Sequence, residues 1–207
     1  MGGRADPAQP DDHHKIGLIA GIINRADNIL RHGIITLLLQ TLSESTVITI
    51  TLADFHNPAH AQAILNLLNE YASEPMGGGE PLPAWTQENL IAELARRPTA
   101  RALLAWSGDQ AAGLAITFEG FSTFACKPLL NLHDFMVSAR FRGQGVAQQL
   151  LRALDDLARE LNCCKITLEV LEGNEAARAL YRKMGYEGYA LQEATGVAQF
   201  WQKKRAA

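Results

Sequence analysis

The sequence predicts a mixed α/β protein, with a central sheet of mostly antiparallel strands and a parallel β-α-β unit at its core. From residue 46 onward, strand-like and helix-like periodicities follow one another in the order β-α-α-β-β-β-α-β-α-β-β. The three consecutive strands favour antiparallel neighbours, whereas the β-α-β passage from 129 to 170 favours a parallel pair. The helices are therefore expected to cover both faces of the sheet.

The first half of this pattern begins with an alternating strand at 46–53 and a helix at 59–71. The Pro- and Gly-rich stretch 74–83 then breaks the pattern. A second helix is expected at 86–95, with Thr86 as its N-cap. Three strand-like runs come next, at 101–106, 111–118 and 129–137.

A long amphipathic helix opens the second half. Its apolar residues recur mostly three or four positions apart, which predicts one buried stripe: Val146, Leu150, Leu151, Leu154, Leu157 and Leu161. A strand at 165–170 and a helix at 174–184 follow. Two short strand-like segments finish the chain.

The first 45 residues are expected to form an extension outside the domain of residues 46–207. Residues 1–14 are rich in Gly, Pro, Asp and His, a composition typical of disorder. Residues 16–42 are largely apolar, but charged residues interrupt them, so they fall short of the ~20 apolar residues of a membrane span. They predict one or two amphipathic helices, and no membrane partner is expected.

Composition argues against several classes of function. The 207 residues carry a formal net charge of -3, which disfavours a broad nucleic-acid-binding surface. Three cysteines without a secretory signal favour a cytoplasmic protein without a disulfide framework. No Cys-x-x-Cys pair occurs, and no third ligand accompanies His56 and His60, so no metal site is expected.

A glycine-rich turn before the long helix is the first candidate site. The N–H groups and the dipole of a helix N-terminus together attract an anion. Gly143 and Gly145 allow the backbone to approach one, and Arg142 adds a positive charge. The turn is no dinucleotide fingerprint, because Gln148 stands where Gly or Ala is needed, and it is no Walker loop. A turn that only permits tight helix–strand packing is the alternative.

The second candidate element is the helix that begins near Asn174. If Asn174 caps this helix, Tyr181 lies two turns further along the same face. Both polar groups would then face the end of the sheet where the glycine turn opens.

Together these elements resemble the GNAT family of N-acetyltransferases, which transfer an acetyl group from acetyl-CoA to an amine. The turn is similar to that family's pyrophosphate motif, and it consists of Arg142, Gly143, Gln144, Gly145, Val146 and Ala147. Asn174 and Leu180-Tyr181, with Gly185-Tyr186, are similar to its second motif. The resemblance covers about residues 46–207. It implies a GNAT-type sheet and acetyl-CoA as co-substrate, bound by the turn and Asn174.

The resemblance also implies direct acetyl transfer within a ternary complex. Backbone groups of Phe135, Met136 and Val137 would meet the pantetheine arm and the thioester carbonyl. Tyr181 would donate a proton or a hydrogen bond to the departing thiolate; a tyrosine packed under the sheet is the alternative. The amine needs a base because it is protonated at pH 7.

Within the family, Leu132–Val137 and Gly120–Phe124 most resemble the small-amine branch that includes diamine acetyltransferases. That branch often has Glu where this chain has His133. Histidine suits the role of base because it is largely neutral at pH 7, although a water chain could share the work and a packed histidine is the alternative. Glu169 and Glu119 are further candidates that could also attract a cationic amine.

The acceptor is expected to meet the segment between the first two helices, where the family has its acceptor-facing loop. Met76, Gly77 and Gly78 are the candidates there, in a segment that its glycines make mobile; a surface linker is the alternative. The predicted function is an N-acetyltransferase of small primary amines. A protein or peptide acetyltransferase and a non-catalytic acyl-CoA-binding module are the competing functions, and homodimers are common in the family.

Overall fold

The computed structural model describes residues 47–190, 192, 194 and 196–205. The predicted extension, with its amphipathic helices, lies outside these residues. In the part of the chain that is described, no helix is both long enough and apolar enough to cross a membrane.

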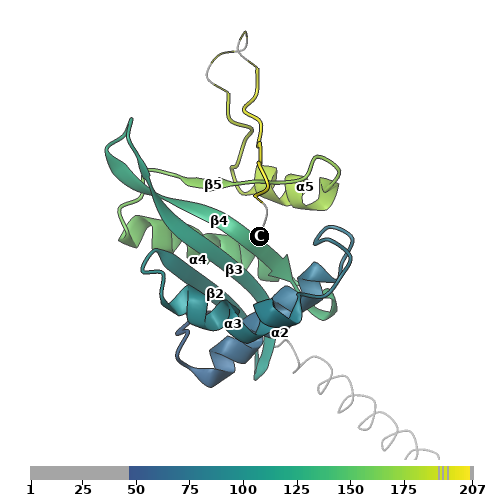
Figure 1. Ribbon diagram of the computed structural model, residues 1–207. Helices are drawn as coiled ribbons and strands as arrows, with labels where there is room; N and C mark the ends of the chain where they lie inside the picture. Colours follow the sequence, from purple (N-terminus) through teal and green to yellow (C-terminus); the bar gives the residue numbers. More distant parts are fainter. Residues whose placement is uncertain (1–46, 191, 193, 195, 206–207) are drawn as a thin grey trace, which may run out of the picture. The chain divides into compact units, whose positions relative to one another are not determined.

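In the described part of the chain, five strands form one sheet in the order β1-β2-β3-β4-β5 (Figure 1). Their bounds are Ile48–Leu52, Ala100–Ser107, Gln110–Ser122, Lys127–Val137 and Ile166–Leu168. Strands β1 to β4 pair antiparallel, and β4 pairs with β5 in parallel. The predicted mixed, mostly antiparallel sheet with its parallel unit is confirmed.

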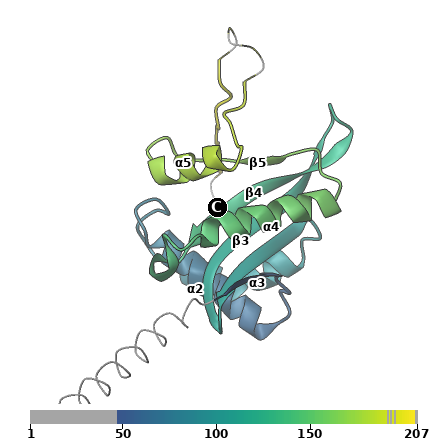
Figure 2. The ribbon, with the colours of Figure 1, turned by 180° about the vertical axis from the view of Figure 1, so that it is seen from behind.

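Among the described residues, four α-helices accompany this sheet, with bounds Pro58–Ala72 (α2), Ala84–Ala95 (α3), Val146–Glu160 (α4) and Glu175–Lys183 (α5). Helices α2 and α3 pack on one face, and α4 covers the other (Figure 2). The predicted N-cap of α3 is wrong, because Pro83 occupies that position and Thr86 lies within the first turn. Proline suits a helix start because its ring fixes φ and the first N–H groups lack helical partners anyway.

The core consists of two apolar layers, one on each side of the sheet. On the α4 side, Leu150, Leu151 and Leu154 are fully buried, which confirms the predicted stripe. On the opposite side, Ile64 of α2 packs with Leu104 and other residues of the central strands. Each such side chain contributes roughly 1.5–3 kcal/mol on burial, so the helices are held to the sheet mainly by apolar contact.

The end of the chain differs from the prediction of two strands. Among the described residues beyond α5, a single bridge joins Ala190 and Val197. The apolar side chains that suggested strands remain exposed, including Tyr189, Phe200 and Trp201. Alternation alone produces a strand only when a neighbouring edge supplies hydrogen-bond partners, and the described residues of this segment form a bridge only with one another.

Candidate active site

The parallel strands β4 and β5 separate partway along β4. They pair only from Leu130 to Leu132 of β4, whereas β4 continues to Val137. Beyond Leu132, β4 remains paired with β3 on its other edge. The predicted pantetheine-binding residues Phe135, Met136 and Val137 lie on this stretch, so their backbone has one edge that β5 does not occupy.

A β-bulge lies where the two strands part. Leu132 pairs with Thr117 and Asp134 pairs with Ile116, so His133 is the extra residue between them. A bulge of this kind bends the strand and redirects the inserted side chain. The ring of His133 contacts Phe118 edge-on, with ring centroids 5.4 Å apart.

A cavity of about 120 Å3 opens beside this bulge. It brings together six of the predicted site residues, from four separate segments: Met76, His133, Phe135, Glu169, Asn174 and Tyr181. The remaining lining residues are Tyr71, Leu132, Val170, Leu171 and Ala177. Residues that are up to 110 positions apart in the sequence therefore meet in one small space.

Tyr181 is the most buried polar group of the cavity, with 8% of its surface exposed. Its ring packs between Phe135, at 6.0 Å, and Tyr186, at 5.7 Å. Burial, with a smaller effect from Tyr71, raises the pKa of Tyr181 to about 12. The hydroxyl therefore remains protonated at neutral pH and is a hydrogen-bond donor.

Two neighbouring groups were not among the sequence-based candidates. Tyr71 of α2 lines the cavity, and burial together with the charges of Asp134 and Glu74 raises its pKa. Burial also raises the pKa of Asp134, an effect that the adjacent His133 opposes. Tyr71 follows the buried face of α2 at helical spacing from Leu68, which was the available signal.

The two glutamates proposed as candidates lie in different places. Glu169 lines the cavity and accepts from the Asn131 side-chain amide, at 3.3 Å to each carboxylate oxygen. Glu119 does not line it; its charge instead acts on Cys163, where it adds to the effect of burial in raising the thiol pKa. The structure therefore brings only Glu169 to the site.

The glycine turn lies between β4 and α4. Gly143 and Gly145 have φ values of +76° and +80°, and a Cβ built on either would meet no atom within 4 Å. Gly145 is the N-cap of α4, with no side-chain cap and no acidic residue in the first turn. The first N–H groups of α4, at Val146 and Ala147, are thus free to face a ligand, as an anion site requires.

Two carboxylates of the α2 end hold the other side of this turn. Glu70 accepts from the Ala139 N–H at 2.9 Å, and Glu74 forms an ion pair with Arg142. The Arg142 Nε also donates to the Val137 carbonyl at 3.0 Å. Gln144 donates to the Arg140 carbonyl at 3.0 Å and closes the turn internally. The guanidinium of Arg142 is therefore oriented both by β4 and by the segment that follows α2.

Asn174 is the N-cap of α5, as the sequence predicted. Its Oδ1 accepts from the Ala177 N–H at 3.1 Å. The cap fixes the first turn of α5, and Tyr181 then follows two turns later. Both residues line the same cavity, which confirms that they share a face.

The segment after α2 is wound into turns, where the sequence predicted a mobile loop. The N–H groups of Gly77, Gly78 and Gly79 all donate to the Glu74 carbonyl, at 2.9 to 3.1 Å. A Cβ at Gly77 would lie 1.9 Å from the Tyr71 carbonyl oxygen, so glycine is needed there for close approach. Met76 lines the cavity, whereas Gly77 and Gly78 do not.

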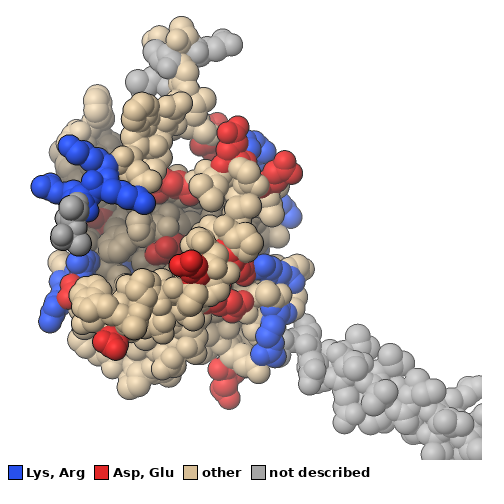
Figure 3. All heavy atoms as spheres, turned by 45° about the vertical axis from the view of Figure 1, so that its right-hand side comes forward, with Lys and Arg blue, Asp and Glu red and all other residues tan. Residues whose placement is uncertain are grey.

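Acidic side chains gather in and around a hollow on the face shown in Figure 3. Near the cavity, Glu169 is part of the wall, and the negative charges of Asp134 and Glu74 help to raise the pKa of Tyr71. Such a field attracts a cation and repels an anion. Over the described residues, no group of three or more His, Cys, Asp or Glu side chains could hold a metal ion.

Comparison with known proteins identifies the family. The family model described as "Acetyltransferase (GNAT) family" matches residues 61–186, more than half of the chain. This chain belongs to the GNAT family of acetyltransferases. The predicted resemblance is therefore confirmed.

Two curated relatives illustrate how far the likeness extends. The thialysine N-epsilon-acetyltransferase of Caenorhabditis elegans is 27% identical over 130 residues, 62% of this chain and 78% of that protein. The uncharacterized N-acetyltransferase YdgE of Bacillus subtilis (strain 168) is 46% identical over 55 residues, 27% of this chain. The match to YdgE spans only 35% of that protein's length.

Solved structures support the same fold. The crystal structure of a probable acetyltransferase aligns with 75% of this chain and 99% of its own, with a TM-score of 0.63 and 21% identity. At this identity the likeness shows the fold alone.

Proposed function

We propose that this chain transfers the acetyl group of acetyl-CoA to the primary amine of a small molecule, by direct transfer within a ternary complex. The observation that carries the proposal is the cavity at the parting of β4 and β5, because it holds Tyr181, His133 and Glu169 together. Membership of the GNAT family and the thialysine acetyltransferase among its relatives support the same reaction and a small amine as acceptor.

The residues of the glycine turn fit the pyrophosphate of acetyl-CoA. Gly143 and Gly145 leave open space above the backbone, α4 has no side-chain cap, and Arg142 is held nearby by Val137 and Glu74. The free edge of β4 at 135–137 would bind the pantetheine arm. Acetyl-CoA supplies an acetyl group that is already activated as a thioester.

The cavity residues would carry out the proton transfers and stabilise the leaving group. The amine nitrogen forms the new C–N bond to the acetyl carbon as the C–S bond breaks, and the electron pair of that bond leaves with sulfur. His133 would accept the amine proton, directly or through water. The Tyr181 hydroxyl would donate a hydrogen bond to the departing sulfur, and Glu169 would attract the cationic amine before it reacts.

The size and charge of the cavity favour a small amine over a protein. About 120 Å3 accommodates an amino group and a few carbon atoms, and the acidic surroundings favour a cation. A peptide N-terminus that is acetylated faster than every small amine tested would contradict this choice of acceptor.

The proposal is tested first by calorimetric binding of acetyl-CoA to the wild type and to Gly145→Glu. The glutamate brings a negative charge to the proposed anion site, so affinity should fall at least a hundredfold. Gly108→Glu is the matched control, because Gly108 also has a positive φ and open space but lies in the β2–β3 turn. An amine screen that measures thiol release follows. Absence of acetyl-CoA binding, or equal loss in both variants, would refute the proposed turn.

A further inference from the structure

A second hollow, of about 310 Å3, lies along α3, away from the cavity that holds Tyr181. We name it the α3 groove, and its lining residues are Trp85, Thr86, Leu90, Glu93, Leu94, Arg97 and Phe118. Leucine and aromatic side chains dominate its wall. Trp85 has 69% of its surface exposed, although its indole ring is large and mostly apolar.

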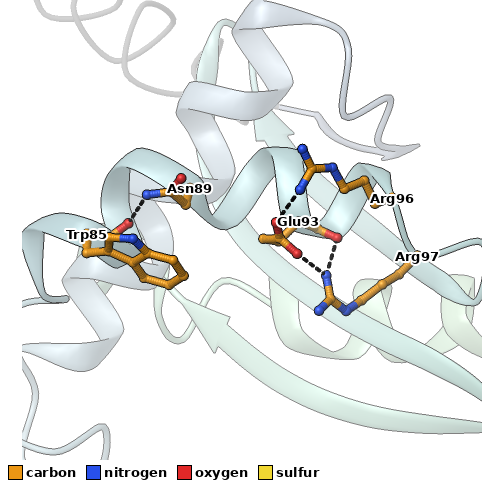
Figure 4. Close-up of polar contacts among 5 residues, drawn as sticks. All are labelled: Trp85, Asn89, Glu93, Arg96 and Arg97. Atoms are coloured by element: carbon orange, nitrogen blue, oxygen red, sulfur yellow. Dashed lines mark hydrogen bonds and ion pairs between the residues drawn. The ribbon is translucent and has the colours of Figure 1, made fainter. Parts of the chain in front are cut away.

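The carboxylate of the groove is paired with arginine. Figure 4 shows the Glu93 carboxylate between two arginines, with Oε1 2.6 Å from Arg96 and Oε2 3.0 Å from Arg97. The Asn89 amide donates to the backbone carbonyl of Trp85 at 2.7 Å and leaves the indole ring at the surface. The groove therefore offers apolar surface without a free negative charge, unlike the acidic cavity.

The groove and the cavity share a wall. Phe118 lines the groove, His133 lines the cavity, and their rings touch with centroids 5.4 Å apart. Both side chains lie on the sheet face that α2 and α3 cover, since Phe118 packs against that layer. The two hollows are therefore neighbours across this pair of rings.

The two volumes differ in a way that matters for the acceptor. The cavity, at about 120 Å3, is smaller than the groove, at about 310 Å3. The hydrocarbon part of a longer amine therefore finds more room in the groove than in the cavity. The rest of such an acceptor needs a second site, and binding energy gained there can be used at the reacting centre.

We propose that the α3 groove binds the apolar end of the acceptor, so that the substrate is a primary amine extended by a hydrocarbon chain or ring. This inference rests on the proposed function and deepens it. A second ammonium group at the far end is disfavoured, because the two guanidiniums that face the Glu93 carboxylate leave a net positive charge there. Trp85, Leu90 and Phe118 are then the residues that determine specificity.

The test uses the full chain and a series of unbranched primary amines from ethylamine to octylamine, each compared with the diamine of equal length. In the wild type, kcat/KM should rise with length by about fourfold per methylene that enters the groove, and monoamines should exceed diamines. Trp85→Ala should lower the octylamine-to-ethylamine ratio of kcat/KM at least tenfold, and Trp85→Phe should restore part of it. Phe124→Ala is the matched control, since it removes a fully exposed aromatic ring from the β3–β4 turn, and it should leave the ratio unchanged.

Several results would overturn the inference. They are a kcat/KM that does not depend on length, a preference for diamines, and a Trp85→Ala ratio equal to that of the wild type. Sedimentation that shows a dimer broken by Trp85→Ala, with amine kinetics unchanged, would make the groove a subunit interface instead. If no amine, short or long, supports thiol release from acetyl-CoA, both the proposed function and this inference fail. If short amines are acetylated but kcat/KM does not rise with chain length, only this inference fails.

Discussion

Replacing Tyr181 with phenylalanine tests the part of the proposed mechanism that the structure constrains best. Burial raises the pKa of this phenol to about 12, whereas a thiol ordinarily titrates near 8.5. Complete proton transfer from the phenol to a thiolate is therefore uphill by roughly 5 kcal/mol, at about 1.4 kcal/mol for each pKa unit. The structure favours a hydrogen bond from Tyr181 to the departing sulfur rather than a transferred proton.

The expected loss follows from this role. Removing one donor that is aimed at a developing charge costs about 10²- to 10³-fold in kcat. Tyr181→Phe should show this loss with acetyl-CoA affinity within about threefold of the wild type, because the hydroxyl is not part of the glycine turn. The assays are steady-state thiol release and calorimetric binding of acetyl-CoA.

The neighbouring Tyr186 provides the matched control. Its ring lies 5.7 Å from that of Tyr181, but its hydroxyl is buried without a hydrogen-bond partner among the described residues and does not line the cavity. Tyr186→Phe should keep full activity and gain about 1 kcal/mol in the free energy of unfolding. Full activity in Tyr181→Phe, or an equal loss in Tyr186→Phe, would refute the donor role.

Three further predictions concern the residues around the cavity. His133→Ala should remove or move the lower ionisation in the pH profile of kcat/KM, and an unchanged profile would dismiss His133 as the base. Burial raises the folded-state pKa of Asp134. The stabilisation that the protonated carboxyl provides is therefore present below the unfolded-state pKa near 4 and is lost as pH rises through the folded-state pKa. Urea unfolding should show that Asp134→Asn is more stable than the wild type at pH 7 but not at pH 3. Gly77→Ala should lose about 2 kcal/mol or more, since its Cβ would meet the Tyr71 carbonyl, whereas Gly79→Ala, with open space but a positive φ, should lose about 1 kcal/mol in thermal unfolding.

The elements that the sequence predicted are those whose signals are local. The 3.6-residue spacing of leucines sufficed for α4, and Asn174 sufficed for the start of α5, because each depends on contacts within a few residues. The C-terminal strands show the limit of this reasoning. Two short strand-like segments were predicted at the end of the chain. Strand pairing depends on an edge elsewhere in the molecule, and the described residues beyond α5 show a bridge between Ala190 and Val197 alone.

Candidate site residues could be predicted from the sequence where a short motif contains them. They could not be predicted where strand register, or contact between distant segments, determines their position. His133 was a candidate from the sequence alone, but the bulge that makes it the unpaired residue arises from the pairing of β3 and β4. Glu119 was a candidate by residue type, yet its place on β3 puts it beside Cys163. Tyr71 was missed because it belongs to a helix that is more than 100 residues from Tyr181 in the sequence.

The contacts of α2 explain how the two halves of the site are kept in register. The end of this helix holds the glycine turn through Glu70 and Glu74, although these contacts join residues 69 and 68 positions apart. The Glu74 carbonyl also accepts the three N–H groups that shape the turn beside Met76. Glu74 thus contacts the proposed pyrophosphate site through its side chain, and the turn at the proposed acceptor site through its backbone carbonyl. A ligand that displaces the carboxylate of Glu74 from Arg142 would therefore act on the same turn that positions Met76 in the cavity, and the two substrates would not bind independently.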